Sequence, residues 1–214
     1  MARIARFSTG VLWLLLGCLW IRAALGEEAP TPPVAPAPPD SSATVKVVLK
    51  TTLGDIVLAL EPERAPLTTN NFLHYVDQKR FDGSEFYRAM KLDDEGKYGL
   101  IQGGLRGNPK RVFKPIAHEP TSATGLSHVN GAISMARAEP GTANADFFIA
   151  IGDLASFDAR PEDPGYAVFG RVVDGMDVVH AILEQPRSEE AGEGVMKGQM
   201  LAPPVKILSA RRLP

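Results

Sequence analysis

Two charged side chains stand on either side of a predicted turn in the stretch GAISMARAEPGTANADFFIAIG, residues 131–152. Apolar residues alternate before and after the turn, which is typical of paired strands, and the segment Gly141 to Asn144 supplies the connection. Paired strands bring Arg137 and Asp146 to similar heights above that turn. Because an opposite charge within about 4–6 Å favours an ionised carboxylate, we expect Asp146 to pair with an arginine. Arg88 and Arg137 are the candidates, and the spacing favours Arg137.

The signatures of the common catalytic and cofactor sites are missing from the sequence. It contains no HExxH zinc motif, no CxxC pair, no phosphate-binding loop and no GxSxG nucleophile turn. The histidines stand singly, and single histidines are usually solvated or capping residues; they are His74, His118, His128 and His180. We therefore expect neither a metal site nor a cofactor.

Length and charge restrict the class of protein. The chain has 214 residues, 44% of them hydrophobic and 22% charged, as expected for one globular domain with appendages. Its 23 basic and 25 acidic residues nearly balance, and no block of like charge is present that could follow a phosphate backbone. Nucleic acid is therefore excluded as an expected partner.

The first 26 residues have the pattern of a secretory signal. Arg3 and Arg6 precede the apolar run 11–21, which is too short to span a bilayer comfortably, and small residues lead to a cleavage site after Gly26. We predict a signal peptide over residues 1–26, a periplasmic mature protein and no stable membrane span in the mature chain.

The only cysteine, Cys18, leaves a second interpretation open, in which it is the lipidated first residue of a lipoprotein. Against this, the residues that follow Cys18 are still apolar, where a lipoprotein tether is usually polar. Residues 27–43 are rich in proline, a composition that favours an extended, semi-rigid linker.

In the rest of the chain, apolar and polar residues alternate as in a mainly β protein. Residues 45–49 and 56–60 predict a hairpin, and helices are expected from Pro66 to before Phe81 and within residues 175–185. Further alternating segments predict strands at 85–90, 99–104, 166–173 and 204–213. Many short strands with only two helices indicate an antiparallel barrel or sandwich.

Five motifs in sequence order then resemble one family. FYRAM, LIQGG, GAISMARA, DFFI and YAVFGRVVDGMDVV have the order and character of the cyclophilins, over residues 44–214, and are most similar to exported bacterial members. The resemblance implies a closed eight-stranded antiparallel β-barrel capped by two α-helices. It also implies a monomeric peptidyl-prolyl cis-trans isomerase (EC 5.2.1.8) without a cofactor, which accelerates X-Pro isomerisation in proline-containing polypeptides as exported proteins fold.

The same resemblance assigns roles to single residues. Arg88 matches the catalytic arginine, Gln102 the glutamine that positions it, and Phe148 the floor of the proline pocket. By strand alternation, Phe147 should face the opposite side from Phe148. The remaining predicted substrate-binding residues are Leu100 and Phe157 as walls, Ala136 and Arg137 along the peptide backbone, Asp146 where the family has glutamine, and Tyr166 where it often has histidine.

Three departures from the family pattern bear on catalysis. Gly99 replaces a pocket phenylalanine, six extra residues separate Arg88 from Gln102, and Asp146 replaces a neutral amide. They leave open a slow or inactive cyclophilin that acts as a proline-peptide-binding chaperone, because a pocket can bind proline by apolar burial without stabilising the twisted bond. A more remote alternative is an unrelated barrel that binds a small molecule.

Overall fold

The computed structural model describes residues 43–214. The predicted signal peptide, residues 1–26, lies outside the described residues, as does all but the last residue of the predicted linker, 27–43. Over residues 43–214, no helix is long and apolar enough to cross a membrane.

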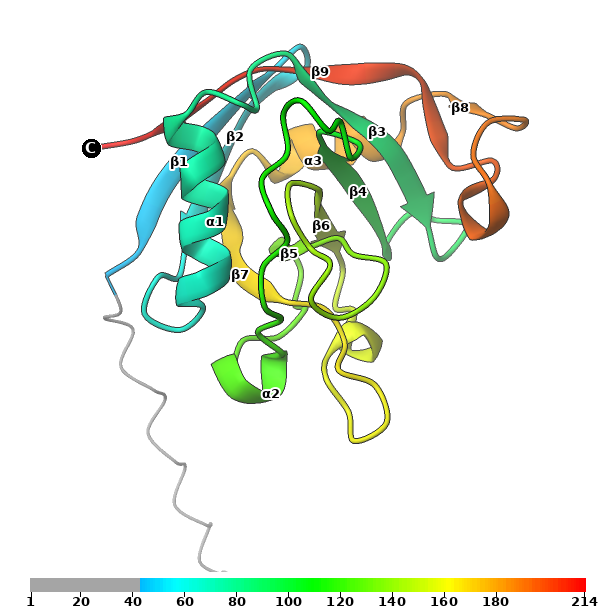
Figure 1. Cartoon of the computed structure of the whole chain (residues 1–214). Helices are drawn as coiled ribbons and strands as arrows, with labels where there is room; N and C mark the ends of the chain where they lie inside the picture. Colours follow the sequence, from blue (N-terminus) through cyan, green and yellow to red (C-terminus); the bar gives the residue numbers. More distant parts are fainter. Residues whose placement is uncertain (1–42) are drawn as a thin grey trace, which may run out of the picture. The chain divides into compact units, whose positions relative to one another are not determined.

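Eight strands close into an antiparallel barrel (Figure 1). Their order is β1, β2, β7, β5, β6, β4, β3 and β9, and β9 pairs again with β1 to complete the ring. The eight are β1 (Val45–Thr51), β2 (Gly54–Leu60), β3 (Ser84–Lys91), β4 (Gly99–Gly104), β5 (Ala132–Met135), β6 (Phe147–Ile151), β7 (Val168–Asp174) and β9 (Met200–Arg212). A two-residue strand, β8 (Arg187–Ser188), pairs only with β9. The predicted closed eight-stranded barrel is confirmed.

The hairpin of β1 and β2 shows how local sequence sets the register. The Thr51 hydroxyl donates to the Gly54 carbonyl at 2.7 Å and accepts from the Leu53 amide at 3.1 Å, which closes the turn. Gly54 adopts a φ of 137°, where glycine is favoured. With Thr51 opposite Gly54, the alternating residues Leu49 and Ile56 face each other, and both are completely buried.

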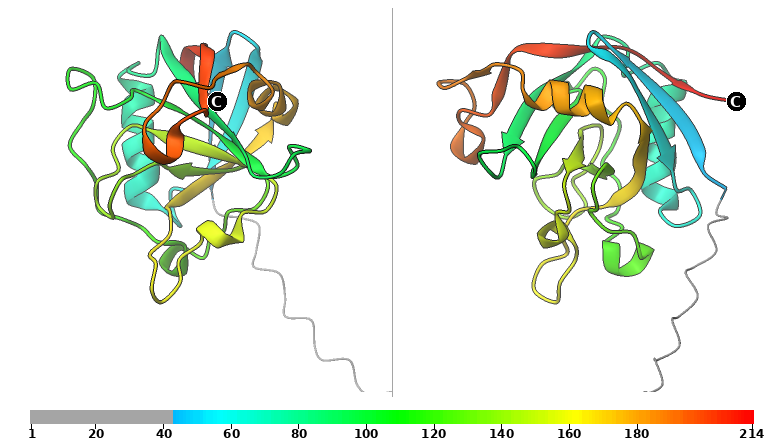
Figure 2. Two further views of the ribbon diagram at one scale, coloured as in Figure 1. Left: turned by 90° about the vertical axis from the view of Figure 1, so that its right-hand side faces the viewer. Right: turned by 180° about the vertical axis from the view of Figure 1, so that it is seen from behind.

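Two longer helices pack against different strands of the barrel (Figure 2). Helix α1 (Pro66–Asp77) contacts β9 and β7, and α3 (Met176–Leu183) contacts β2, β3 and β4. The amides of Leu67 and Thr68 at the start of α1 donate to the Glu119 carboxylate at 3.1 and 2.7 Å, so a residue about fifty positions away caps this helix.

A third helix, α2 (Thr121–Thr124), was not among the two predicted from sequence. It is a single turn, too short to show apolar periodicity, and it ends at Gly125 with a φ of 66°. Residues 43–214 also contain two 3₁₀ turns, η1 (Ala155–Phe157) and η2 (Gly194–Met196).

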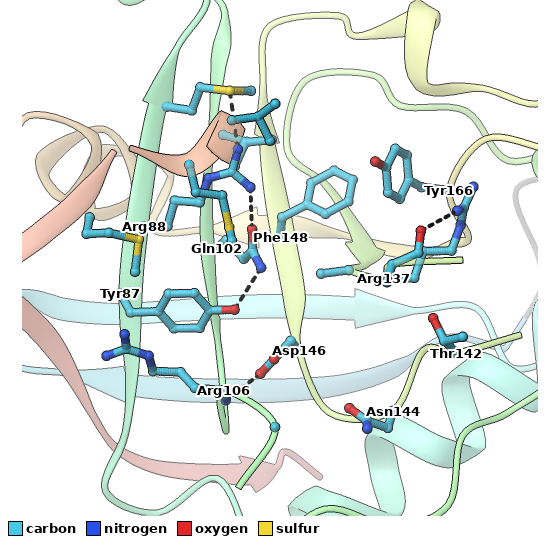
Figure 3. A pocket seen from close by; sticks show the side chains of 18 of the residues that line it. Tyr87, Arg88, Gln102, Arg106, Arg137, Thr142, Asn144, Asp146, Phe148 and Tyr166 are labelled. Atoms are coloured by element: carbon cyan, nitrogen blue, oxygen red, sulfur yellow. Dashed lines mark hydrogen bonds between the residues drawn. The ribbon is translucent and has the colours of Figure 1, made fainter. Parts of the chain in front are cut away.

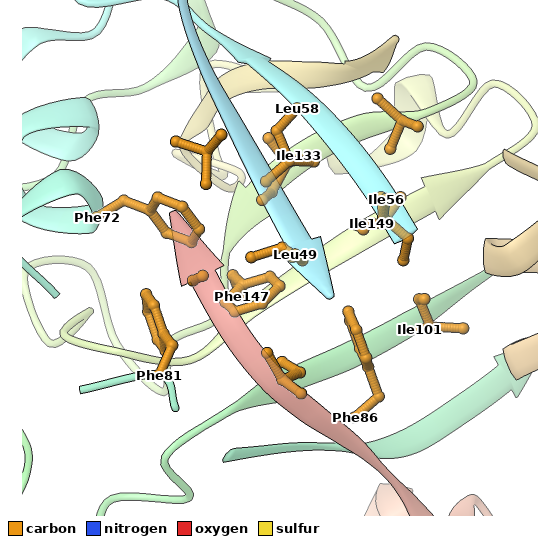
Figure 4. Close-up of a cluster of buried hydrophobic side chains, with 14 of the residues drawn as sticks. Leu49, Ile56, Leu58, Phe72, Phe81, Phe86, Ile101, Ile133, Phe147 and Ile149 are labelled. Carbon is orange, nitrogen blue, oxygen red and sulfur yellow. The ribbon is translucent and has the colours of Figure 1, made fainter. Parts of the chain in front are cut away.

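The barrel interior is filled by alternate residues of the strands and by the apolar face of α1 (Figure 4). Phe147 is completely buried and meets three other phenylalanine rings edge-on, Phe72, Phe81 and Phe86, with centroids 5.4, 5.6 and 5.8 Å away. Edge-to-face pairs of this kind stabilise a core beyond their buried area. Phe147 is thus a core residue, and Phe148, its neighbour along the strand, faces the other side of the sheet.

The extra residues that the family resemblance predicts lie in the loop between β3 and β4, residues 92–98. In this loop Tyr98 is 47% exposed, and Lys91 at its base forms a 2.6 Å ion pair with Glu184 just after α3. A Cβ atom at Gly99 would stand 2.4 Å from the Met90 carbonyl oxygen. The close approach of β3 therefore requires glycine there.

Candidate active site

One cavity of about 670 Å³ brings together all nine residues that the sequence analysis singled out for catalysis or substrate binding. They are Arg88, Leu100, Gln102, Ala136, Arg137, Asp146, Phe148, Phe157 and Tyr166. Figure 3 shows Arg88, Gln102 and Tyr87 in a hydrogen-bonded row on one side of Phe148, with Arg137 and Tyr166 on the other. A volume of this size is typical of a binding pocket for a small ligand or a short peptide segment.

Arg88 is held by three neutral acceptors: two glutamine amides and the Met90 sulfur, to which its Nη2 donates at 3.5 Å. It lies directly across from Gln102 in the β3–β4 ladder, and its Nη1 donates to Gln102 Oε1 at 2.8 Å. Its Nε donates to the Oε1 of Gln199 at 2.8 Å. Partial burial lowers the pKa of Arg88, but a guanidinium stays protonated in proteins. The site therefore holds a cation whose plane is fixed and whose charge no partner cancels.

The Gln102 amide is itself oriented by a neighbour. Its Nε2 donates to the Tyr87 hydroxyl at 2.7 Å, so its oxygen must face Arg88. Tyr87 is buried, which raises the pKa of its phenol, and the Arg106 guanidinium lies over its ring at 5.1 Å. The Tyr87 hydroxyl therefore stays protonated at neutral pH, and the row Tyr87, Gln102 and Arg88 has one arrangement of donors and acceptors.

Three aromatic rings form the apolar part of the cavity. Phe148 meets Tyr166 at 5.5 Å and 90° and Phe157 at 5.9 Å and 77°, and the Phe157 and Tyr166 rings lie 5.5 Å apart. Their faces and edges enclose a hollow that an apolar ring can fill. Because Arg88 lies beside Phe148, a ligand seated there is within reach of the cation (Figure 3).

His128 lies beneath this floor, and its expected role as a solvated or capping residue is wrong. Its ring is completely buried, stacked parallel to Phe148 at 5.7 Å, with Nδ1 2.6 Å from Asp158 and Nε2 3.0 Å from the Ser134 hydroxyl. Burial lowers the pKa of His128, although Asp158 acts in the opposite direction.

Serine, histidine and aspartate in a row suggest nucleophilic chemistry, but the geometry excludes it here. Both Ser134 and His128 are 0% exposed, so the hydroxyl cannot reach a substrate in the cavity. Ser134 lies opposite Phe148 in the β5–β6 ladder. The three residues instead support the underside of the aromatic floor.

The expected ion pair between Arg137 and Asp146 is absent. Asp146 Oδ1 accepts from the amides of Leu105 and Arg106 at 2.7 and 2.9 Å, and Arg137 Nε donates to the Gly165 carbonyl at 3.2 Å. The Arg137 guanidinium also lies over the Tyr166 ring at 4.8 Å.

Competition from backbone hydrogen-bonding groups explains why Arg137 and Asp146 do not pair. The loop after β4 presents two amides that need an acceptor, and Asp146 supplies it, whereas Arg137 turns toward the loop before β7. Burial raises the pKa of Asp146, partly offset by those amide hydrogen bonds. This is opposite in direction to the shift that an ion pair would cause.

Several lining residues were not singled out from the sequence. Met90 of β3, Val195 and Met196 of η2, and Met200 at the start of β9 all line the cavity. A smaller hollow of about 460 Å³ adjoins it and shares Tyr87, Arg106, Met196 and Met200 with it. No local pattern in residues 189–200 points to the site, because the barrel closure alone brings this segment beside β3.

Over residues 43–214, no three histidine, cysteine or acidic side chains gather in a way that could hold a metal ion. The cavity offers the Arg88 cation with its neutral partners, the ionisable side chains of Arg106, Arg137 and Asp146, and an apolar floor.

Comparisons with known proteins agree with this geometry. The family model described as cyclophilin type peptidyl-prolyl cis-trans isomerase/CLD matches residues 46–212. A peptidyl-prolyl cis-trans isomerase of Acinetobacter baylyi is 34% identical over 172 residues, 79% of this chain and 86% of that protein. The isomerase cyp18 of Streptomyces antibioticus is 38% identical over 174 residues, 78% of this chain and 98% of that protein.

A solved structure shares the fold. It is a cyclophilin-type peptidyl-prolyl cis-trans isomerase of Cryptosporidium parvum, crystallised in the presence of the dipeptide Ala-Pro. It has a TM-score of 0.64 and 21% identity, and the match covers 79% of this chain and 99% of that chain.

Proposed function

The chain belongs to the cyclophilin-type peptidyl-prolyl cis-trans isomerases, and from this membership we propose that the cavity around Arg88 is its catalytic site and that its substrates are exported proteins. The reaction rotates an X-Pro bond, whose barrier of roughly 18–20 kcal/mol comes from amide resonance. It requires neither a nucleophile nor a cofactor, only interactions that are stronger in the twisted state than in the planar one.

Phe148 is assigned to the floor that holds the proline ring, with Leu100 and Phe157 as walls. Burying an apolar side chain contributes about 1.5–3 kcal/mol of binding energy, enough to seat the ring. The presence of Ala-Pro with the Cryptosporidium parvum relative supports a proline-containing ligand here. Ala136 and Arg137 form the edge along which we place the peptide backbone, and Tyr166 and Asp146 complete the rim.

Arg88 is assigned to the prolyl nitrogen. As the bond twists, the nitrogen lone pair leaves conjugation and becomes an acceptor, so a donor aimed at it stabilises the twisted state selectively. The observation that carries this proposal is the position of Arg88 beside Phe148, held by the neutral amides of Gln102 and Gln199. Neither amide neutralises the guanidinium, so its full charge remains available to the substrate.

The test is turnover of a short X-Pro peptide, followed by NMR exchange spectroscopy, with binding measured on the same peptide. We expect wild-type protein to accelerate exchange between the cis and trans forms. Binding without acceleration would contradict the proposed role of the cavity and would favour the peptide-binding chaperone.

Export rests on the N-terminal pattern. We propose that residues 1–26 are removed and that a monomeric mature protein begins near Glu27 in the periplasm, where newly exported chains fold. N-terminal sequencing of material recovered from the periplasm tests this. A mature chain that begins at a lipidated Cys18 would contradict it.

A further inference from the structure

Gln199 is a polar residue of the catalytic region that no sequence motif identifies. It precedes β9, is partly buried, and its carbonyl accepts from the Ala89 amide at 3.0 Å. The β3–β9 register shifts between Phe86 and Arg88, and the segment before β9 docks at that irregularity. The backbone therefore fixes Gln199 beside Arg88, although the two residues are 111 positions apart.

Both ends of the Gln199 amide are used. Its Oε1 accepts from Arg88 Nε at 2.8 Å, and its Nε2 donates to the Val195 carbonyl at 2.8 Å. The amide can be placed in only one way, because a guanidinium has no acceptor and a carbonyl has no donor. Gln199 thus connects Arg88 to the η2 turn.

That turn forms part of the cavity wall. Val195 and Met196 both line the cavity, and Val195 is 86% exposed. The Gln199 side chain therefore links this part of the cavity wall directly to Arg88.

Two amide acceptors at different nitrogens restrain the Arg88 guanidinium more than one can. Gln102 binds Nη1, and Met90 offers Nη2 only a weak thioether acceptor at 3.5 Å, so Gln199 at Nε supplies the second strong hydrogen bond that fixes the plane. Both acceptors are neutral, so they orient the cation without weakening its field. A carboxylate at position 199 would orient it equally but would cancel part of its charge.

We propose that Gln199 is a second positioning residue for Arg88, which holds the catalytic guanidinium in its plane and ties it to the η2 turn. This inference rests on the proposed role of Arg88 in isomerisation.

Gln199→Met tests it, because methionine has nearly the same length and lacks both amide groups. We expect kcat to fall about tenfold with KM changed less than twofold, since the peptide still binds but the cation is misaligned in the twisted state. The matched control is Gln185→Met, which removes another partly buried amide. Gln185 follows α3, and its Nε2 donates to the Ala181 carbonyl of that helix at 3.0 Å. The kcat of this control should equal that of wild type.

NMR of the Arg88 side chain distinguishes a positioning role from a purely structural one, because solvent exchange of the Nε–H reports the hydrogen bond to Gln199 directly. The Arg88 Nε–H resonance, assigned by its loss in Arg88→Lys, should be protected from solvent exchange in wild type, Gln185→Met and Gln199→Glu. Only Gln199→Met, which has no acceptor there, should lose the protection. Loss of protection in Gln199→Glu as well, despite its acceptor oxygen, would overturn the proposal.

A double mutant completes the test. If Gln199 acts through Arg88, adding Gln199→Met to Arg88→Lys should lower kcat by less than twofold further. A full tenfold further loss, or unchanged kcat in Gln199→Met alone, overturns the proposal. A wild-type protein without isomerase activity would overturn the proposed function and this inference with it, whereas an active wild type with an equally active Gln199→Met overturns the inference alone.

Discussion

Arg88 and Gln102 face each other across β3 and β4, and Arg88 Nη1 donates to Gln102 Oε1 at 2.8 Å. The ladder itself therefore sets the distance between the proposed catalytic cation and the amide that orients it. A side chain held this way has little freedom to lose when substrate binds, which is the advantage of a preorganised site.

Replacing Arg88 should abolish most of the activity and leave the fold intact. We expect Arg88→Ala to lower kcat/KM by about 10²–10³-fold, the range for removal of one preorganised donor. Arg88→Lys should not restore it, because an ammonium is a compact point charge without the planar fork that binds Gln102 and Gln199 and presents a donor to the substrate. Arg171→Ala, at an exposed arginine of β7, is the control. Wild-type kcat/KM in either Arg88 variant would remove this residue from the mechanism.

Arg137 and Asp146 should contribute independently. Because they bind different backbone groups, the effects of Arg137→Ala and Asp146→Ala on kcat/KM should add within about 0.3–0.5 kcal/mol in the double mutant. Asp146→Gln should change kcat/KM by less than about tenfold, or roughly 1.4 kcal/mol in the barrier. A coupling energy above about 1 kcal/mol would show that the two charges interact in solution.

Substitutions at the two adjacent phenylalanines should affect different properties, stability at Phe147 and activity at Phe148. Phe147→Ala empties a position among three core rings and should lower the free energy of unfolding by about 3–5 kcal/mol. Phe148→Ala should cost less stability but lose most of the turnover, because Phe148 faces the cavity. Urea denaturation and peptide exchange on both variants check this. A folded Phe148→Ala protein with normal turnover would rule out Phe148 as the floor.

The buried His128 should make stability depend on pH. Its pKa in the folded protein is below the unfolded value of about 6.5, so the unfolded chain takes up a proton first as the pH falls. The free energy of unfolding should therefore be unaffected by this group above about pH 7 and decrease as the pH falls from there toward the folded pKa. This component should be absent from His128→Gln and retained in His180→Gln, at an exposed histidine of α3. An unchanged pH profile in His128→Gln would contradict the assignment.

Local pattern was sufficient to predict an antiparallel barrel or sandwich and the faces of its strands, and the family resemblance selected the closed barrel. Alternation along β6 alone predicts that Phe147 and Phe148 face opposite sides, since successive strand residues must do so. The five motifs contain eight of the nine predicted site residues, because each motif lies in or directly beside a strand whose register the core enforces. The ninth, Phe157, lies outside them in η1.

Only the tertiary structure determined which groups the polar side chains bind. The charges of Arg137 and Asp146 suggested a pair, but the amides of Leu105 and Arg106 and the carbonyl of Gly165 compete for them. Those groups come from loops whose approach no local pattern encodes. Backbone groups outnumber side-chain charges near any buried site and must also be satisfied, so they often prevail.

The same reason applies to His128 and Gln199. His128 has no sequence neighbour that marks it as buried, yet it meets Asp158 thirty positions away. Gln199 reaches Arg88 only because β9 closes the barrel against β3. Periodicity reports which face of an element is apolar, a local property of the chain. The choice of a hydrogen-bond partner depends on which distant segments the closed barrel brings within about 3 Å, and that distance exists only in the folded molecule.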